Sequence, residues 1–241
     1  MKDLWTNSPY YRKALQSNDQ VTTDLALLDL AGAESLVDVG CGNGAFAIEA
    51  ARRRPNCRVI ACDILESAVA ECRKAGADLL GRNLEVLLAS AESIPLPSRS
   101  VDRVLMRNVL HHLPDPRTAL TKVTRLLTPS GLFLLEGPCN ALGEDFAGLL
   151  SEIHKLMDDS HPRTYLTPAR MQAVFEEQGL AVTLNESWPF PFRVGPEQVS
   201  LIQKHHAQDA LKLHMRGDNS YIQMKIARLV AVGGERLRVS D

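Results

Sequence analysis

The sequence predicts an α/β fold in which helices cover both faces of a mostly parallel sheet. Residues 36–44 read Leu-Val-Asp-Val-Gly-Cys-Gly-Asn-Gly, the pattern of a buried strand followed by a glycine-rich turn. A helical pattern follows directly at 45–54. A chain of 241 residues suits one such domain with additions and is too short for two large domains.

The glycine turn predicts a ligand cradle. Gly40, Gly42 and Gly44 have no Cβ, so a ligand can lie against the backbone, and free N–H groups at the helix start favour a negatively charged group. In the dinucleotide fingerprint G-x-G-x-x-G the third glycine comes about five residues after the first. Here Gly44 comes four residues after Gly40. The turn therefore indicates a different nucleotide-like cofactor, the alternative being that its glycines serve packing alone.

The composition gives no sign of a nucleic-acid or membrane partner. The formal net charge is −2, and the densest basic run, at 52–54, ends a predicted helix, where cations suit the helix dipole. We expect a cytoplasmic protein, because we find no secretory signal and no long apolar span. The five cysteines form no C-x-x-C pair and are expected to be free thiols: Cys41, Cys57, Cys62, Cys72 and Cys139.

An acidic residue ends the second predicted strand. Residues 58–63 read Arg-Val-Ile-Ala-Cys-Asp, and ligands of open α/β sheets bind beyond the carboxyl ends of the strands. An acid about 20 residues past the glycine turn can accept hydrogen bonds from both hydroxyls of a ribose. Asp63 is therefore the strongest single binding candidate, and the alternative is that it caps the helix predicted at 66–75.

Four stretches, in order, resemble the motifs of one enzyme class. Residues 38–44 resemble the first motif, (D/E)-x-G-x-G-x-G, of class I S-adenosylmethionine-dependent methyltransferases. Residues 90–97 resemble their G-D-A-E-x-L-P-F stretch, and residues 126–136 their L-x-P-G-G turn and fifth strand. Residues 100–115 resemble the S-F-D-x-V-x-x-x-x-V-L-H-H-L-x-D run of the small-molecule group related to ubiquinone and menaquinone biosynthesis.

This resemblance implies a Rossmann-like class I methyltransferase fold with a seven-stranded, mostly parallel sheet, and S-adenosylmethionine as cofactor. After the first two strands, the others are expected at 83–89, at 100–106, within 126–136, at 181–187 and at 222–232. The implied cofactor-binding residues are Asp38, Gly40, Cys41, Gly42, Asp63, Ile64, Ser90, Ala91, Glu92, Asn108 and Val109.

One position departs from the family pattern. Ser90 stands where the family has the Asp that binds the adenine amino group. Adenine recognition would then rest on the Ala91 backbone, on the weaker Ser90 hydroxyl or on Glu92. Because of this departure, the alternative that the chain binds the cofactor without catalysing methyl transfer stays open. A second alternative, an NAD(P)-dependent reductase, is disfavoured by the glycine spacing.

We expect the whole chain, 1–241, to be a single methyltransferase domain. An N-terminal arm at 1–35 precedes a cofactor-binding core at 36–137, and two candidate substrate-cap insertions follow at 138–165 and 188–217.

Within the arm, Thr22 or Thr23 is expected to N-cap a helix that runs through Leu30.

Aromatic residues of the arm and of the second insertion are the substrate-binding candidates. They are Tyr10, Tyr11, Trp188 and Phe190, whose rings could close over an apolar acceptor. The alternative for the arm is that its aromatics anchor it on the core. The alternative for the first insertion is a plain packing helix, since apolar residues at helical spacing are more often core.

Methyl transfer from a sulfonium is an in-line displacement, so the protein chiefly aligns donor and acceptor in a dry pocket. A general base is needed only where the acceptor must lose a proton, and His111 and His112 are the weak candidates. The alternative is that one shapes the loop and the other packs. No acidic cluster follows the fourth strand, so no metal is expected. The sequence does not determine which atom of the acceptor is methylated. It is also compatible with a homodimer.

Overall fold

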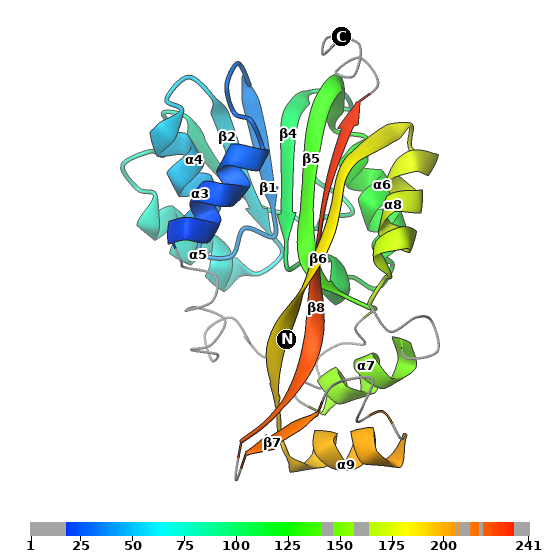
Figure 1. Ribbon diagram of the computed structural model, residues 1–241. Helices are drawn as coiled ribbons and strands as arrows, with labels where there is room; N and C mark the ends of the chain where they lie inside the picture. The colour runs from blue at the N-terminus through cyan, green and yellow to red at the C-terminus, as the bar shows by residue number, and fades with distance from the viewer. Residues whose placement is uncertain are drawn as a thin grey trace.

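The computed structural model describes residues 18–140, 147–156, 164–205, 207, 213–216 and 219–233. Figure 1 shows a central sheet with helices on both faces and a smaller group of elements beyond one end. The elements are α3 (Asn18–Leu27), β1 (Ser35–Val39), α4 (Ala45–Arg53), β2 (Arg58–Asp63), α5 (Glu66–Ala75), β3 (Leu84–Leu88), β4 (Val101–Arg107), η1 (Leu110–His112), α6 (Pro116–Thr124), β5 (Leu127–Cys139), α7 (Ala147–Lys155), α8 (Pro168–Glu177), β6 (Leu180–Val194), α9 (Pro196–Lys204), β7 (His214–Arg216) and β8 (Asn219–Gly233).

The sheet has the strand order β3-β2-β1-β4-β5-β8-β6, and the short β7 pairs with β8. β1 pairs in parallel with both β2 and β4, while β3 and β5 extend the parallel part on either side. β8 runs antiparallel to β5 and β6. The predicted seven-stranded, mostly parallel sheet is therefore confirmed, with β7 as a small addition. The order of the strands reverses between β1 and β4, and such a switch point opens a ligand crevice at the carboxyl ends of the strands.

Side chains of the strands alternate between two apolar cores, one on each face of the sheet. On β1, Leu36 packs into the core beneath α3, α4 and α5, whereas Val37 and Val39 pack into the core beneath α6 and α8. In the second core, the fully buried rings of Phe133 and Phe175 meet edge to face, with centroids 5.0 Å apart. Burial of both faces accounts for the nearly continuous apolar runs of the parallel strands.

The first helix differs from its prediction. The helix α3 begins at Asn18, so Thr22 and Thr23 lie inside it, and the prediction that one of them is the N-cap is wrong. Its buried face already starts at Val21, and contact with the core outweighs the local cap signal. The helix ends before the predicted Leu30, because the backbone turns at Asp29, whose φ is 45°.

The last two predicted strands are too short. β6 continues to Val194 and β8 begins at Asn219. Their pairing runs from Trp188 opposite Ile226 onward to Val194 opposite Ser220. Two paired antiparallel strands can extend past the edge of a core, because each strand satisfies the backbone hydrogen-bonding groups of the other. The stretch expected as the second insertion therefore begins with a continuation of β6.

Two helices from the expected insertions pack on each other and form what we call the α7/α9 lobe. Leu149, Leu150 and Ile153 of α7 meet Val199 and Ile202 of α9 in a separate apolar core. In Figure 1 the lobe lies below the main sheet, at the end toward which the paired strands β6 and β8 extend. The two insertions are thus joined by contacts that neither could make alone.

All five cysteines are buried thiols outside any disulfide, as predicted. Within the described ranges, no helix combines the length and the apolar character that crossing a bilayer would require.

Ile153→Ala is expected to destabilise the α7/α9 lobe by about 2 to 4 kcal/mol, because this fully buried side chain would leave a cavity. Hydrogen exchange should quicken in α7 and α9, while β1 and β4 keep their protection. Leu156→Ala is the matched control, since that side chain follows α7 and is 44% exposed. Equal effects of both variants, or loss of protection throughout the sheet, would contradict a separate lobe core.

Candidate functional site

The turn after β1 is closely packed at its glycines. Gly40, Gly42 and Gly44 have φ values of 70°, 54° and 81°, a region that other residues rarely adopt. A Cβ on Gly40 would lie 2.1 Å from Val109 Cγ2, and one on Gly44 would lie 2.3 Å from Cys72 Sγ. Gly40 and Gly44 are required both by the backbone conformation and by these neighbours, and Gly42 by its backbone conformation. The turn leads directly into α4, so it places bare backbone at a helix N-terminus.

Asp63 ends β2 beside this turn. Its Oδ2 atom accepts a hydrogen bond from the Gly42 N–H at 3.0 Å, and its Oδ1 atom accepts one from the Leu65 N–H at 3.0 Å. Leu65 is the N-cap of α5, and no side chain caps that helix. The alternative role of Asp63 as a helix cap is therefore not what the structure shows. Its carboxylate is instead fixed between the turn and the residues after β2, where Ile64 is 57% exposed.

The stretch after β3 folds into a tight turn. The Glu92 N–H donates to Ser90 Oγ at 3.3 Å, and the Ser93 N–H donates to the Ser90 carbonyl at 3.0 Å. Ala91 is buried between two more exposed neighbours. The hydroxyl of Ser90 thus shapes its own turn, and Glu92 carries the exposed carboxylate of this stretch.

The residues after β4 close the crevice. Asn108 has a φ of 55°, and its N–H donates to the Glu136 carbonyl at 2.8 Å. A Cβ on Gly137 of β5 would lie 3.5 Å from the Asn108 backbone. Val109 follows and packs on Gly40 as described. The carboxyl ends of β1, β2, β3 and β4 therefore lie side by side at one edge of the sheet, where an open α/β sheet has its ligand crevice.

Comparison with known proteins identifies the family of the core segment. Residues 37–135 match the sequence profile of a family described as "Methyltransferase domain". An uncharacterized methyltransferase of Mycobacterium bovis is 35% identical over 109 residues, which is 44% of this chain and 53% of that protein. The ubiquinone/menaquinone biosynthesis C-methyltransferase UbiE of Rickettsia bellii is 30% identical over 126 residues, covering 50% of this chain and 49% of that one. Residues 37–135 are a class I S-adenosylmethionine-dependent methyltransferase domain.

The likeness in fold is wider than the likeness in sequence. The crystal structure of YcgJ from Bacillus subtilis covers 90% of this chain and 98% of that one, with a TM-score of 0.76 at 20% identity. By sequence, this chain spans about half the length of the Mycobacterium and Rickettsia relatives. The methyltransferase domain is thus identified by its core motifs, and the elements after β5 are related to solved structures by fold.

The methyltransferase domain presents the predicted cofactor-binding residues at adjacent strand ends. They fall in four groups, after or at the end of β1, β2, β3 and β4: Asp38, Gly40, Cys41 and Gly42; Asp63 and Ile64; Ser90, Ala91 and Glu92; Asn108 and Val109.

The predicted substrate residues are placed only in part. Tyr10 and Tyr11 lie outside the described residues. Trp188 and Phe190 lie in β6. Their backbones lie opposite Ile226 and Met224 of β8, where the two paired strands extend toward the α7/α9 lobe.

His111 joins the methyltransferase core to the α7/α9 lobe. It lies in η1 and is 2% exposed, and its ring stacks on Tyr165 with centroids 5.6 Å apart. Its carbonyl accepts a hydrogen bond from the Thr164 N–H at 3.3 Å. The ring of His112 is half-buried. Its centroid lies 4.1 Å from the centroid of the His111 ring, and the two ring planes are tilted by 40°. These contacts favour a packing role for His111 and leave His112 as the more accessible of the two candidate bases.

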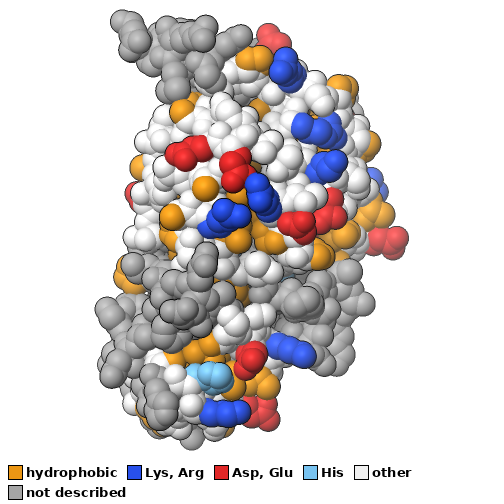
Figure 2. Space-filling model, turned by 90° about the vertical axis from the view of Figure 1, so that its right-hand side faces the viewer, with side chains coloured by type: hydrophobic (Ala, Val, Ile, Leu, Met, Phe, Trp, Pro, Cys, Tyr) orange, Lys and Arg blue, Asp and Glu red, His pale blue; other side chains and the backbone are white. Residues whose placement is uncertain are grey.

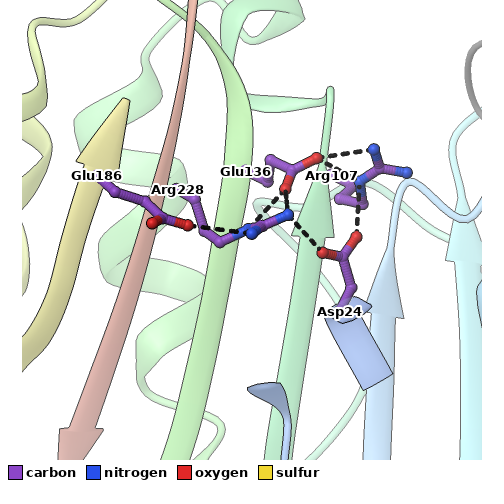
Figure 3. Close-up of polar contacts among 5 residues, drawn as sticks. All are labelled: Asp24, Arg107, Glu136, Glu186 and Arg228. Carbon is purple, nitrogen blue, oxygen red and sulfur yellow. Dashed lines mark hydrogen bonds and ion pairs between the residues drawn. The ribbon is translucent and has the colours of Figure 1, made fainter. Parts of the chain in front are cut away.

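The sequence analysis missed a row of charged side chains that crosses four strands (Figure 3). Arg107 of β4 lies opposite Glu136 of β5, which lies opposite Arg228 of β8, which lies opposite Glu186 of β6. Arg107 Nη2 and Arg228 Nη2 lie 2.7 and 2.6 Å from the two Glu136 oxygens. Asp24 of α3 completes the row, 3.1 Å from Arg107 Nε and 2.9 Å from Arg228 Nη2. We call these five residues the charge row.

A signal for the charge row was present in the sequence. Arg107 directly follows the apolar run at 104–106, Glu136 follows the run at 132–135, and Arg228 precedes the run at 229–232. A charge in a buried strand is rarely tolerated without a partner. Their mutual pairing could not be read locally, because Arg228 lies 92 residues after Glu136.

Asp38 of β1 lies on the same face of the sheet, fully buried beside the charge row. Burial raises the pKa of its carboxyl to about 7; the neighbouring Arg107 opposes this shift and Asp63 adds to it. Burial also holds the pKa of Asp24 well above its usual range, with Glu136 adding to the effect. The pKa values of both Asp38 and Asp24 therefore lie above those of ordinary aspartates.

Asp38→Asn is expected to change how stability depends on pH. The folded protein keeps the Asp38 proton up to about pH 7, whereas an unfolded chain loses it near pH 4. The folded state thus binds more protons between these values, and the wild-type free energy of unfolding falls as the pH rises through this window. Relative to wild type, the variant should gain about 2 to 3 kcal/mol between pH 5 and pH 8, measured by denaturant unfolding. A difference that stays constant with pH would contradict the buried, protonated carboxyl.

Proposed function

We propose that the chain is an S-adenosylmethionine-dependent methyltransferase that acts on a small-molecule acceptor by in-line methyl transfer, without a metal ion. The observation that carries this proposal is the Asp63 carboxylate, held by the Gly42 N–H at the mouth of the glycine turn. It joins the two features that the cofactor requires, a bare backbone turn and an acceptor for ribose hydroxyls.

The residues of the crevice suit the chemical groups of this cofactor. Each Asp63 oxygen accepts one backbone hydrogen bond, which leaves lone pairs for the ribose hydroxyls. Ile64 offers an exposed apolar surface next to this acid, where an adenine ring can pack. The positive φ values of Gly40, Gly42 and Gly44 favour residues without a Cβ, so the turn offers bare backbone against which a ligand can lie. Asp38 Oδ2 is buried and makes no hydrogen bond with the described part of the chain, so it can accept one from an ammonium group.

Adenine recognition would use the turn after β3. We assign the ring contact to the Ala91 backbone and the amino group to Glu92, because Ser90 Oγ already accepts the Glu92 N–H. Asn108 and Val109 then border the crevice from the β4 side. This assignment replaces the aspartate of the family pattern by an acid two positions later.

The reaction depends more on alignment of donor and acceptor by the protein than on reactive side chains. The cofactor supplies a methyl group on a sulfonium, an activated donor that needs no further activation. The protein holds the donor against the strand ends and excludes water, which makes the displacement effectively intramolecular. Where the acceptor must lose a proton, His112 is the better placed base, since His111 is engaged in packing.

We further propose that the whole chain works as one domain in the cytoplasm, with no nucleic-acid partner. The segments 138–165 and 188–217 would form the acceptor cap, which their shared α7/α9 core supports. A small-molecule acceptor is supported by the name of the Rickettsia relative, which places it in quinone biosynthesis. Whether two copies associate is open to a measurement of molecular mass in solution.

A second candidate function is a module that binds the cofactor without turnover. The observation in its favour is Ser90, which replaces the acid that the family uses for adenine. A screen of metabolite extracts with methyl-labelled cofactor separates the two, because only an enzyme moves the label to an acceptor.

S-adenosylmethionine and its demethylated product should bind in the micromolar range, about −8 kcal/mol, as measured by calorimetry. Tight binding of NADH with no binding of either sulfur ligand would refute the proposed function.

Asp63→Ala should weaken binding of S-adenosylmethionine by roughly 2 to 4 kcal/mol, because two charge-assisted hydrogen bonds are lost, and Asp63→Asn should cost less. Unchanged affinity in both variants would reduce Asp63 to a residue that only holds the turn.

Trp188→Ala, Phe190→Ala and Tyr11→Ala should lower turnover or raise the Michaelis constant of the acceptor. Cofactor affinity should stay within about threefold, roughly 0.7 kcal/mol, because these positions belong to the cap or arm and not to the strand ends. Initial rates with one working acceptor, alongside cofactor titrations, make the comparison. If all three variants keep full turnover and unchanged acceptor dependence, the acceptor enters elsewhere.

A further inference from the structure

Arg107 has one guanidinium nitrogen that the charge row leaves open. The residue is 8% exposed, and among the described residues its ion pairs are with Glu136 and Asp24. Its Nη2 and Nε atoms face these two acids, whereas Nη1 is buried and makes no hydrogen bond with the described part of the chain. Because a buried charged donor without a partner is costly, the open nitrogen indicates a place where a ligand atom binds.

The neighbours of Arg107 direct this open nitrogen toward β1. Its Cζ atom lies 4.6 Å from the centroid of the Phe46 ring, and Phe46 is the second residue of α4, which begins directly after the glycine turn. In Figure 3 the nitrogen that carries no dashed line points away from Glu136 and Asp24. Glu136 comes from β5 on one side of β4, and β1 lies on the other side. Nη1 is therefore directed toward the strand from which the glycine turn begins.

Asp38 of β1 lies on the same face of the sheet as Arg107. Its backbone lies opposite Leu105 in the parallel pairing of β1 and β4, so Arg107, two residues further along β4, projects from the same face. This register places the two α-carbons about 8 Å apart, close enough for one small group to reach both side chains. Asp38 Oδ2 is also buried and makes no hydrogen bond with the described residues. An acid and a cation, each with one open atom, therefore border the start of the glycine turn.

The order of the strands brings one part of the cofactor to this pair. On the proposed function, the adenine ring lies at the turn after β3 and the ribose lies at Asp63 of β2. The next strands in the sheet are β1 and then β4. The third part of S-adenosylmethionine, its α-amino acid end, continues from the ribose through the sulfur atom. It therefore reaches the carboxyl ends of β1 and β4.

The charges of the pair match those of an α-amino acid. Ammonium and carboxylate are attached to one carbon, so an acid and a guanidinium on neighbouring strands can bind both groups at once. In and beside the charge row, three buried carboxyl groups outnumber two buried cations: Asp24, Glu136 and Asp38 against Arg107 and Arg228. A zwitterion adds no net charge to this group, whereas a simple anion would add another negative charge. The balance of charge therefore favours an amino acid over a plain carboxylate.

We propose that Arg107 binds the carboxylate of the α-amino acid end of the cofactor through Nη1, beside the ammonium at Asp38. Glu136 and Asp24 are then positioning residues, which hold the guanidinium for this contact. The inference rests on the proposed function and deepens it, because it assigns a residue of the charge row to the cofactor. S-adenosylmethionine and its demethylated product both carry this end, so both use the site.

Calorimetric titrations of the full chain with S-adenosylmethionine and with decarboxylated S-adenosylmethionine test the inference. The two ligands share the adenine, the ribose, the sulfonium and the amino group, and they differ in the carboxylate. The wild-type chain should bind S-adenosylmethionine about 10- to 100-fold more tightly, the range that one hydrogen bond to a charged group supplies.

Arg107→Gln removes the cation that this preference depends on. Its affinity for S-adenosylmethionine should fall about 10- to 100-fold, its affinity for the decarboxylated form should fall by less than about threefold, and the preference should largely disappear. Arg103→Gln is the matched control, because Arg103 is the other buried arginine of β4 on this face and donates to the carbonyls of Leu28 and Asp29. This control should keep the wild-type preference. Circular dichroism establishes that each variant is folded.

A wild-type chain without the preference, or an Arg107→Gln variant that keeps it, overturns the assignment of Arg107 and leaves the methyltransferase proposal standing. Equal weakening of both ligands by Arg107→Gln also overturns the assignment, because Arg107 would then only support the fold around the site. Failure of both ligands to bind the wild-type chain overturns the proposed function itself.

A second measurement serves if Arg107→Gln does not fold. A crystal structure of the wild-type chain with S-adenosylhomocysteine should show a carboxylate oxygen about 3 Å from Arg107 Nη1. A carboxylate bound by other groups, with Nη1 left out of contact, would overturn the assignment.

Discussion

The pairing of Arg107 and Arg228 with Glu136 and Asp24 is the interaction on which the architecture depends. It ties α3 to β4, β5 and β8, and its members Asp24 and Arg228 are 204 residues apart in the chain. Buried ion pairs add little net stability, because desolvation offsets most of their attraction, but a partner left alone is costly. A slip of one residue in any of these strands would turn a charged side chain to the opposite, apolar face. The charge row thus penalises every register except the observed one.

The charge row also lies where the parallel part of the sheet meets the strands that lead to the α7/α9 lobe. Glu136 lies three residues before the end of β5, from which the chain leaves toward α7. Arg228 lies within the part of β8 that pairs with β5, whereas the earlier part of β8, which extends to the α7/α9 lobe, pairs with β6 and β7. His111 makes a second junction, since it packs on Tyr165 of the lobe core. The lobe is therefore tied to the main sheet both through the strands of the charge row and through His111.

Much of the core was predictable because its signals are local. The strand at 58–63 and the helix at 66–75 have the predicted bounds, since each is delimited by turn residues within a few positions. The glycine turn was predictable because positive φ and close packing demand residues without a Cβ. The start of α3 was not predictable from its threonines, since its buried face against the core, beginning at Val21, sets where it begins.

By itself, the sequence determined the α/β class, the positions of the parallel strands along the chain, the turn that suits a nucleotide-like cofactor, and the acid at Asp63. These follow from periodicity and residue type within short windows. Only the tertiary structure decided that Asp63 holds the Gly42 N–H, that the two insertions share one core, that β6 and β8 run past the sheet, and that Arg107 joins a buried charge row. The reason is physical: strand register and desolvation depend on residues about 100 or more positions apart, and a buried charge acquires its partner, and its proton, only when the chain is packed.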